Sequence, residues 1–465
     1  MKRTLRRSTL ILIFTIAFII GIGFFTVELV IEAKDWVDQP YNAHISGNGG
    51  LEQAGKILDR DGNRLAETID GERVYNDDEG VRKALLHTVG DNSLNISTAV
   101  QSKYRSNLTG YSLIWGLNMP QSMRTSRDIT LTVDSETCKT AYNMLQSGFE
   151  EPKRGACVIY NYKTGEVICS VSTPGYDPED PPKITEDNES IYDGVYLDNV
   201  LSSTYTPGSI FKIVTAAAAV ENIPDLYERS WYCEGVEEIG GHEVHCYDST
   251  AHGDVNIYEA MEHSCNIVFA KLAVELGSEK MNAMAEKMGV NMSFNVDDVK
   301  TAKGHYNAPK NDVNVLGWTG VGQGSGEYED KVNPMQMAMI CASVANGGTA
   351  VNPSYIKSGT GDILKEIGIT HNKTYDFLSA DTARQVGEIM PEYSIGGLTV
   401  RAKTGTAEVN EDKNPNSWFV GYSADSDCPL AFACVVEDSG MGSSYARPVI
   451  EAVLSTAAER LRGKM

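Results

Sequence analysis

Ser209 and Lys212 have the residue types and the spacing of a nucleophile and its base. A Pro-Gly pair precedes them and an apolar run follows, which predicts that the serine lies at the start of a buried helix. Residues three apart share a helix face, so the lysine can reach the hydroxyl, and burial with nearby cations can lower its pKa enough to make it a base. The pair alone is weak evidence, because capping serines are common and Ser354 and Lys357 repeat the spacing in a predicted loop.

A second polar group, Ser264 and Asn266, stands directly before an apolar helical segment. This spacing lets a short turn aim both side chains into one cleft. Serine and asparagine are also common helix caps, so capping is the competing interpretation. We retain the pair as catalytic candidates because it follows the Ser209 helix and has a buried helix behind it.

The third candidate group lies in a predicted strand, residues 400–409. It consists of Lys403, Thr404, Gly405 and Thr406. The lysine amine and the two threonine hydroxyls suit a substrate carboxylate. A glycine inside a strand marks the close approach of a ligand backbone or of another chain. The same motif type occurs at Lys163 and Lys357, in a predicted hairpin turn and a loop, so it counts only together with the other two groups.

The hydrophobic pattern predicts the elements that must hold these groups in place. Helical patterns cover residues 210–220, 258–276, 335–346 and 448–461. Strand patterns cover a hairpin at 155–171 and single strands at 399–408, 417–423 and 430–437. Strands at both ends with helices between them predict one sheet built from distant segments and flanked by helices, an α/β (α+β) domain.

The N-terminus predicts a single membrane-spanning helix. Basic residues open the chain, and the apolar run from Leu10 to Val27 is about long enough to cross a bilayer. No small-x-small cleavage site follows, so we expect an uncleaved anchor with its N-terminus in the cytoplasm and the rest of the chain outside. The predicted divisions are a cytoplasmic tail at 1–8, a transmembrane helix at 9–28, a small membrane-proximal domain at 29–152 and a catalytic domain at 153–465.

Charge and cysteine content limit the partners. A formal net charge of −23 argues against binding to nucleic acid or to anionic lipid.

The nine cysteines show no repeated CxxC spacing, so a full disulfide framework is not expected. Cys233 and Cys246 bracket a polar turn and can form one disulfide bond outside the cell. A zinc site with the nearby His242, His245 and His252 is the alternative, but the spacing fits no standard zinc finger, and no metal is assigned.

The three groups in this chain order form the signature of penicillin-binding proteins and β-lactamases. On these motifs the sequence resembles the class B penicillin-binding proteins, which are D,D-transpeptidases of peptidoglycan synthesis. The resemblance covers about residues 55–460 and includes segments at 57–66, 155–174, 322–324, 333–338, 346–348 and 417–422. Two departures are a short stretch before the catalytic domain and Cys265 in the middle of the second motif, whose thiol we do not expect to be catalytic.

The resemblance implies a chemical sequence. Ser209 would attack the carbonyl of the penultimate D-Ala of a stem pentapeptide, and the terminal D-Ala would leave. Lys212, kept neutral by burial and by Lys403, would be the base. Ser264 would pass the proton to the leaving amine, and Asn266 would hold the peptide amide and orient the base. An amine of a neighbouring stem peptide would then take the acyl group and complete the cross-link.

The resemblance also implies how the substrate is held. Lys403, Thr404 and Thr406 would receive its terminal carboxylate, and the backbone N–H groups of Ser209 and Thr406 would form the oxyanion hole. β-Lactams would mimic the donor and leave Ser209 acylated. No metal or organic cofactor is implied.

Several questions stay open at the level of sequence. A separate glycosyltransferase is an expected partner, and the role in cell division, cell shape or sporulation is not determined. A D,D-carboxypeptidase would use the same site with water as the acceptor. A β-lactamase would need a route for fast deacylation, for which the sequence gives no reason. A non-catalytic penicillin sensor or scaffold would have only a short cytoplasmic tail to signal through.

Overall fold

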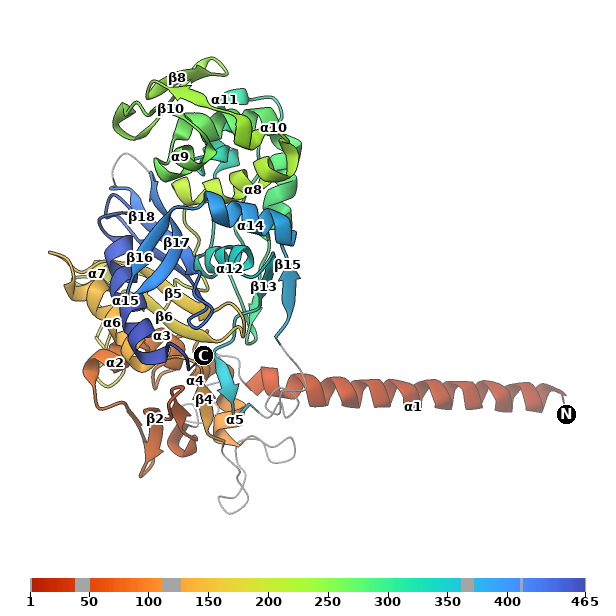
Figure 1. Ribbon diagram of the computed structural model, residues 1–465. Helices are drawn as coiled ribbons and strands as arrows, with labels where there is room; N and C mark the ends of the chain where they lie inside the picture. Colours follow the sequence, from red (N-terminus) through yellow and green to blue (C-terminus); the bar gives the residue numbers. More distant parts are fainter. Residues whose placement is uncertain (1, 38–50, 111–126, 361–371, 410–412, 465) are drawn as a thin grey trace.

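The computed structural model describes residues 2–37, 51–110, 127–360, 372–409 and 413–464 (Figure 1). Its centre is a six-stranded sheet in the order β16-β17-β18-β19-β5-β6, with every neighbouring pair antiparallel. The strands are β5 (Gly155–Asn161), β6 (Val167–Thr173), β16 (Glu392–Ile395), β17 (Leu398–Ala407), β18 (Asn416–Ser423) and β19 (Leu430–Val436). The predicted sheet of distant segments is confirmed, because the hairpin β5–β6 pairs with the C-terminal strand β19.

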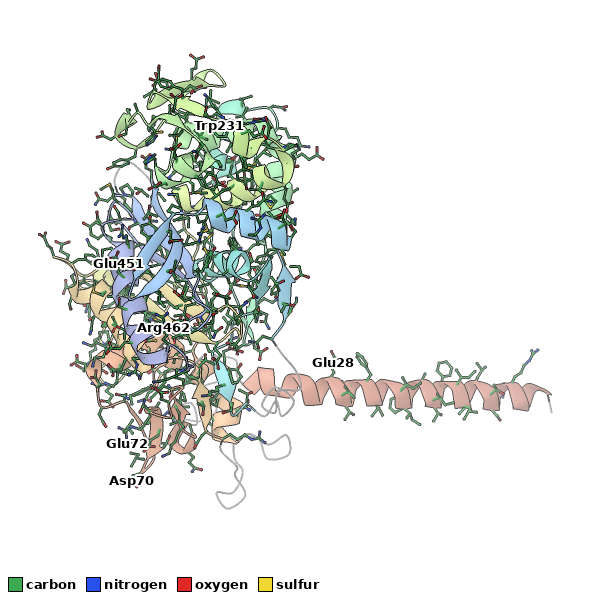
Figure 2. The ribbon with its side chains drawn as sticks, viewed as in Figure 1. Glu28, Asp70, Glu72, Trp231, Glu451 and Arg462 are labelled. Atoms are coloured by element: carbon green, nitrogen blue, oxygen red, sulfur yellow. The ribbon has the colours of Figure 1, made fainter. Side chains whose placement is uncertain are left out.

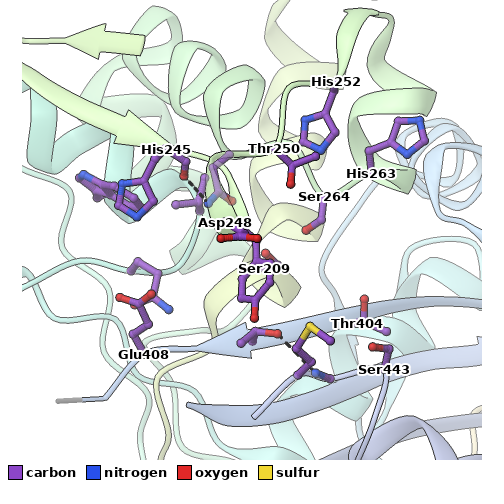
Figure 3. A pocket seen from close by; sticks show the side chains of 18 of the residues that line it. Ser209, His245, Asp248, Thr250, His252, His263, Ser264, Thr404, Glu408 and Ser443 are labelled. Atoms are coloured by element: carbon purple, nitrogen blue, oxygen red, sulfur yellow. Dashed lines mark hydrogen bonds between the residues drawn. The ribbon is translucent and has the colours of Figure 1, made fainter. Parts of the chain in front are cut away.

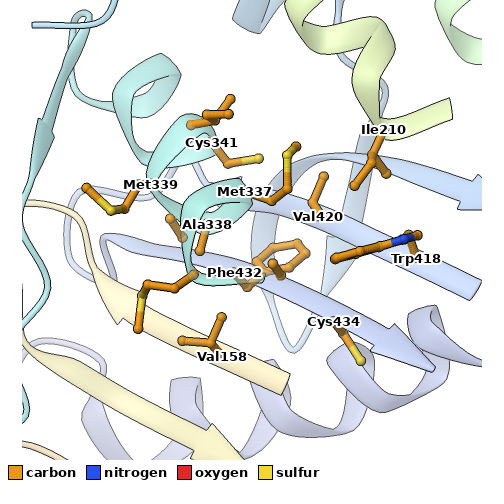
Figure 4. Close-up of a cluster of buried hydrophobic side chains, with 14 of the residues drawn as sticks. Val158, Ile210, Met337, Ala338, Met339, Cys341, Trp418, Val420, Phe432 and Cys434 are labelled. Carbon is orange, nitrogen blue, oxygen red and sulfur yellow. The ribbon is translucent and has the colours of Figure 1, made fainter. Parts of the chain in front are cut away.

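Helices cover both faces of this sheet. Helix α12 (Pro334–Ala345) packs on one face, and α15 (Ala446–Leu461) with α6 (Ser135–Ser147) packs on the other. Figure 4 shows Met337 and Ala338 of α12 above Val420 and Phe432 of the sheet. Strands between two apolar layers are covered on both faces, and every residue of β5, β18 and β19 is accordingly buried.

The short helix α7 (Glu189–Tyr192), which follows β6 in the chain, lies near α6 and α15 (Figure 1). Most of the remaining chain between β6 and β16 forms a helical lobe that packs beside the sheet. Its helices are α8 (Lys212–Asn222), α9 (Ile257–Glu262), α10 (Asn266–Lys287), α11 (Val313–Gly320) and α14 (Ala380–Ile389). Its short strands are β7 (Trp231–Cys233), β8 (Val236–Ile239), β9 (His242–His245), β10 (Gly253–Val255), β11 (Asn295–Val296), β12 (Val299–Lys300), β13 (Thr349–Val351) and β15 (Thr374–Asp376). The alanine-rich α8 is its buried centre and packs against α10 and α14.

One predicted helix is divided in the structure. The pattern over 258–276 predicted a continuous helix, whereas α9 ends at Glu262 and α10 begins at Asn266. Ser264, between them, has φ of 55°, in the left-handed region that no helix interior accommodates. The break turns the chain at the second candidate motif.

The membrane-proximal part is a second sheet in the order β14-β4-β1-β2-β3. Its strands are β1 (Ile57–Leu58), β2 (Arg64–Ile69), β3 (Glu72–Tyr75), β4 (Ile129–Leu131) and β14 (Ile356–Ser358), and its short helices are α2 (Glu79–Ala84), α3 (Leu86–Val89), α4 (Val100–Lys103) and α5 (Arg105–Thr109). Strand β14 comes from beyond the predicted boundary at residue 153, and α6, from before it, packs on the main sheet. Residues 38–50 and 111–126 of the predicted domain lie outside the described residues, and the boundary stays a proposal.

Helix α1 (Lys2–Val37) extends away from the rest of the molecule (Figures 1 and 2). Within it, the segment Arg6–Glu28 is long and apolar enough to cross a membrane, and it is the one such helix among the described residues. Its side chains from Arg6 to Glu28 are exposed. The helix therefore fits the predicted single span.

Candidate active site

Ser209 lies in a tight turn that leads into α8. The turn is the 3₁₀ segment Gly208–Phe211, so the predicted helix starts with one narrower turn. The N–H of Gly208 donates to the carbonyl of Gly322 at 2.9 Å, and the indole N–H of Trp418 donates to the carbonyl of Thr206 at 3.0 Å. These bonds hold the half-buried Ser209 hydroxyl just before the start of the buried helix α8. The sequence predicted this serine at the start of a helix.

The amine of Lys212 lies at the centre of the site. Its Nζ is 3.0 Å from Oγ of Ser209 and 3.1 Å from Oγ of Ser264. It is also 2.7 Å from Oδ1 of Asn266 and 2.7 Å from the carbonyl oxygen of Ser264. The side chain is fully buried, and burial lowers the pKa of Lys212 to about 7. Near neutral pH a large share of these amines is therefore uncharged and able to accept a proton from Ser209.

The turn between α9 and α10 presents the second motif. The N–H of Cys265 donates to the carbonyl of Ala260 at 2.8 Å, which closes the turn around Ser264. Asn266 begins α10, and its Nδ2 donates to the carbonyl of His245 at 2.9 Å. With Nδ2 held in this way, Oδ1 of Asn266 faces Lys212.

Lys403 approaches the same turn from β17. Its Nζ donates to Oγ of Ser264 at 2.9 Å and to the carbonyl of Thr404 at 2.9 Å. Burial, together with repulsion from Lys212, holds the pKa of Lys403 well below its usual range. The hydroxyl of Ser264 thus lies between two buried amines that come from different elements, and the three predicted groups converge on it.

Gly405 was predicted to mark the close approach of a ligand backbone or of another chain, and in the structure a chain segment packs against it. A Cβ atom at this position would lie 2.9 Å from Cγ2 of Ile210 and 3.1 Å from Cβ of Trp418. The chain segment that approaches this glycine is therefore the turn that carries Ser209. Without a side chain at residue 405, β17 lies close enough for Lys403 to reach Ser264.

A groove of about 800 Å³ opens over these residues (Figure 3). Ser209, Ser264 and Asn266 line its helical side, and Thr404 and Thr406 line its β17 side. Strand β16 pairs with β17 only from Leu398 to Arg401, so beyond Arg401 one edge of β17 has no neighbouring strand among the described residues. An extended peptide can add to such an edge through backbone hydrogen bonds.

Other residues of the groove were not predicted from the sequence. Trp318 of α11 and Asp248, in the loop before β10, form part of its wall, and Ser443 follows β19. The N–H of Gly442 donates to Oγ1 of Thr406 at 3.3 Å. Two closely spaced glycines after a buried strand, at 440 and 442, were the one sequence signal for this contact.

The disulfide bond predicted between Cys233 and Cys246 is not formed. Their Sγ atoms lie 3.7 Å apart and both are free thiols, whereas a disulfide bond is about 2.05 Å long. The Sγ of Cys246 also lies 3.8 Å from that of Cys265. Cys233 and Cys246 thus lie side by side, and the sulfur of Cys265 lies next to that of Cys246.

Known proteins resemble this chain over most of its length. The Peptidoglycan D,D-transpeptidase PbpA of Mycolicibacterium smegmatis is 26% identical over 374 residues, which is 71% of this chain and 72% of that protein. Stage V sporulation protein D of Bacillus subtilis is 27% identical over 349 residues, which is 70% of this chain and 52% of that protein.

Solved structures share the fold. The D,D-transpeptidase domain of a peptidoglycan glycosyltransferase from Eggerthella lenta is 26% identical, with a TM-score of 0.71, and the match covers 87% of this chain and 98% of that one. The penicillin G acyl-enzyme complex of penicillin-binding protein A from M. tuberculosis is 25% identical, with a TM-score of 0.72, covering 87% and 99%. The family description "Penicillin binding protein transpeptidase domain" matches residues 155–455. Since this match spans well over half of the sequence, the chain belongs to the penicillin-binding protein transpeptidase family.

Proposed function

We propose that this chain is a serine-type peptidoglycan D,D-transpeptidase that forms an acyl-enzyme on Ser209. The observation that carries the proposal is the contact of 3.0 Å between Oγ of Ser209 and Nζ of Lys212, an amine whose pKa burial lowers to about 7. The names of the similar proteins support the substrate class, since they are D,D-transpeptidases of peptidoglycan.

The proton follows the hydrogen bonds of the site. Neutral Lys212 takes the proton of Ser209 as the hydroxyl attacks the donor carbonyl. Oγ of Ser264 lies 3.1 Å from that amine and opens onto the groove, so it can pass the proton to the leaving nitrogen. The terminal D-Ala then departs, and an amine of a second stem peptide takes the acyl group.

The β17 side of the groove binds the donor. The donor peptide lies along the open edge of β17, and its terminal carboxylate accepts hydrogen bonds from Thr404 and Thr406. A carboxylate arriving beside Lys403 raises the pKa of that lysine again, because opposite charge favours the ammonium form. The backbone N–H groups of Ser209 and Thr406 are the proposed oxyanion hole. β-Lactams occupy the same position as the donor.

The proposed setting is the outer face of the cytoplasmic membrane. Helix α1 spans the bilayer with residues 1–8 in the cytoplasm, as the basic N-terminus favours. Residues 29–152 are the membrane-proximal domain and 153–465 the transpeptidase domain. A separate glycosyltransferase supplies the glycan strands that this enzyme cross-links.

The test is a product assay with the full chain in detergent. A stem pentapeptide donor and an acceptor amine should give a cross-linked product, and Ser209→Ala and Lys212→Ala should each lower its rate by about a thousandfold or more. Lys357→Ala is the matched control, because that exposed lysine belongs to the second serine-lysine spacing and lies on β14. Release of free D-Ala without any cross-linked product would identify a carboxypeptidase instead. Full activity in Ser209→Ala would refute the serine mechanism.

A further inference from the structure

Three sulfur atoms and one imidazole nitrogen converge directly behind the second motif. They belong to Cys233, Cys246, His252 and Cys265, called here the thiol cluster, and all four ligand atoms lie within 4.8 Å of one another. The three cysteines are buried free thiols, and the histidine is half-buried. The proposed reaction uses none of these four side chains.

The distances within the thiol cluster fit a tetrahedral metal site. Cys246 Sγ lies 3.7 Å from Cys233 Sγ and 3.8 Å from Cys265 Sγ, and His252 Nδ1 lies 3.4 Å from Cys233 Sγ. Around a zinc ion with Zn–S of about 2.3 Å and Zn–N of about 2.0 Å, tetrahedral ligands are separated by about 3.8 Å for S···S and about 3.5 Å for S···N. The side chains are thus spaced as ligands of one ion, not as a disulfide.

The local fold brings these four residues together from separate elements. Cys233 ends β7, Cys246 follows the β8–β9 hairpin, and His252 precedes β10, which pairs with β7. The N–H of His252 donates to the carbonyl of Cys233 at 3.1 Å. Cys265 is the N-cap of α10. The pairing of short strands therefore folds the segment 233–252 back onto the start of a buried helix.

We propose that the thiol cluster binds one zinc ion in a closed structural site. Three thiolates and one imidazole are a usual zinc donor set, and with four protein ligands no position is left for a substrate. Of the histidines expected near a zinc site, His252 is the ligand. His245 instead packs against Trp318, and His242 is exposed on β9.

The position of Cys265 connects this site to catalysis, an extension that rests on the proposed function. Cys265 stands between Ser264, whose φ of 55° is strained, and Asn266, which holds Lys212. A metal bond to the Cys265 sulfur restrains the backbone of the turn between α9 and α10. The ion is a positioning element: it stabilises the geometry in which Ser264 and Asn266 meet the two lysines, and it does not touch the substrate.

Metal content tests the site independently of activity. The full chain purified in detergent under reducing conditions, without added chelator, should contain about one zinc ion per chain by elemental analysis. Cys233→Ser and His252→Ala should lose most of the zinc, while His252→Cys, which keeps four ligands, should retain it. His242→Ala is the control and should keep full zinc content. Absence of zinc and other metals from the unmodified protein, or a Cys233–Cys246 disulfide found by peptide mapping, would overturn the proposal.

Cobalt replacement reports the ligand geometry. Exchange of the bound ion for Co²⁺ should give the intense visible absorption of a tetrahedral thiolate site, and the spectrum should weaken in Cys265→Ser. An octahedral cobalt spectrum would contradict the assigned ligands. This readout needs no substrate.

The link to catalysis is measured on the metal-free enzyme. Removing zinc with a chelator should slow acylation of Ser209 by a fluorescent penicillin by about 10- to 100-fold, and adding zinc back should restore the rate. Unchanged acylation of a metal-free, folded enzyme would refute the positioning role. Stoichiometric zinc in a protein that no penicillin acylates would leave the metal site standing and refute the proposed function, so the two failures are distinguishable.

Discussion

In the proposed reaction, the protonation state of Lys212 determines whether Ser209 can react. Burial lowers the pKa of this lysine to about 7, from an ordinary value of 10.5. Below that pH the amine is an ammonium ion and cannot accept a proton, so the rate of acylation by penicillin should rise about tenfold per pH unit and level off above a pH of about 7. Stopped-flow acylation, with circular dichroism at each pH as the folding control, measures this profile. An acylation rate that stays constant from about pH 5 to about pH 9 would exclude Lys212 as the base.

At the same scale, the sequence predicted which residues of the candidate site lie together but not all of their contacts. Ser209 and Lys212 could be paired because helix geometry relates residues three apart. The position of Lys403 beside Ser264 depended on three motifs being taken together, since each one alone recurs in the chain. The packing of Gly405 against Ile210 could not be predicted, because only the tertiary fold decides which segment crosses a strand.

At the scale of elements, the Ser209 turn is held between β17 and the Gly322 loop. Gly208 has φ of 55°, and a Cβ there would lie 2.5 Å from the carbonyl oxygen of Thr406. Gly208→Ala should therefore displace the serine and lower the acylation rate by about 100-fold. Gly241→Ala is the matched control, since Gly241 also has positive φ but no atom within 4 Å of the added Cβ.

The comparison of these two variants separates backbone strain from steric contact. Both should lose about 1–2 kcal/mol of unfolding free energy from the positive φ, and only Gly208→Ala should lose additional stability and activity. Equal acylation rates in the two variants would show that β17 does not fix the turn.

The sequence predicted most of the elements but was ambiguous at one important break. The strands of the main sheet were identifiable as long apolar runs. At residues 263–265 the polar side chains of the second motif predicted a short turn, whereas the hydrophobic pattern over 258–276 predicted one helix, because the break contains neither proline nor glycine. Tertiary bonds of the turn, such as that from Cys265 to Ala260, stabilise a conformation that local preference does not favour.

At the scale of the whole molecule, an ion pair joins the start of α6 to the last turn of α15. The guanidinium of Arg460 on α15 donates to both carboxylate oxygens of Asp134, at 2.9 and 3.0 Å from Nε, and Asp134 is fully buried. Arg460→Met leaves that carboxylate without its cation and should cost about 2–3 kcal/mol of unfolding free energy, somewhat less than for a fully buried pair because the arginine is partly exposed.

Chemical unfolding of the full chain in detergent measures this cost. Arg384→Met is the control, because its ion pair with Asp381 is exposed on both sides and should contribute little to the unfolding free energy. Equal stability of the two variants would mean that α15 and α6 are held together by apolar packing alone.

The overall arrangement was the hardest feature to predict. Strand β14 has three residues and completes the membrane-proximal sheet beside β4, far away in sequence. A strand this short has too few residues to show a period of two, so its pairing becomes visible only in the folded molecule. The candidate membrane span, in contrast, could be identified from the sequence, since length and apolarity alone define it.

The central claim is that three distant segments form one acylation site around the hydroxyl of Ser209. Mass spectrometry of the full chain treated with penicillin tests it most directly. We expect one penicilloyl group per chain, on the peptide that contains Ser209, persisting for many minutes and absent from Lys212→Ala. A label on a different serine, or no label on the folded protein, would contradict it.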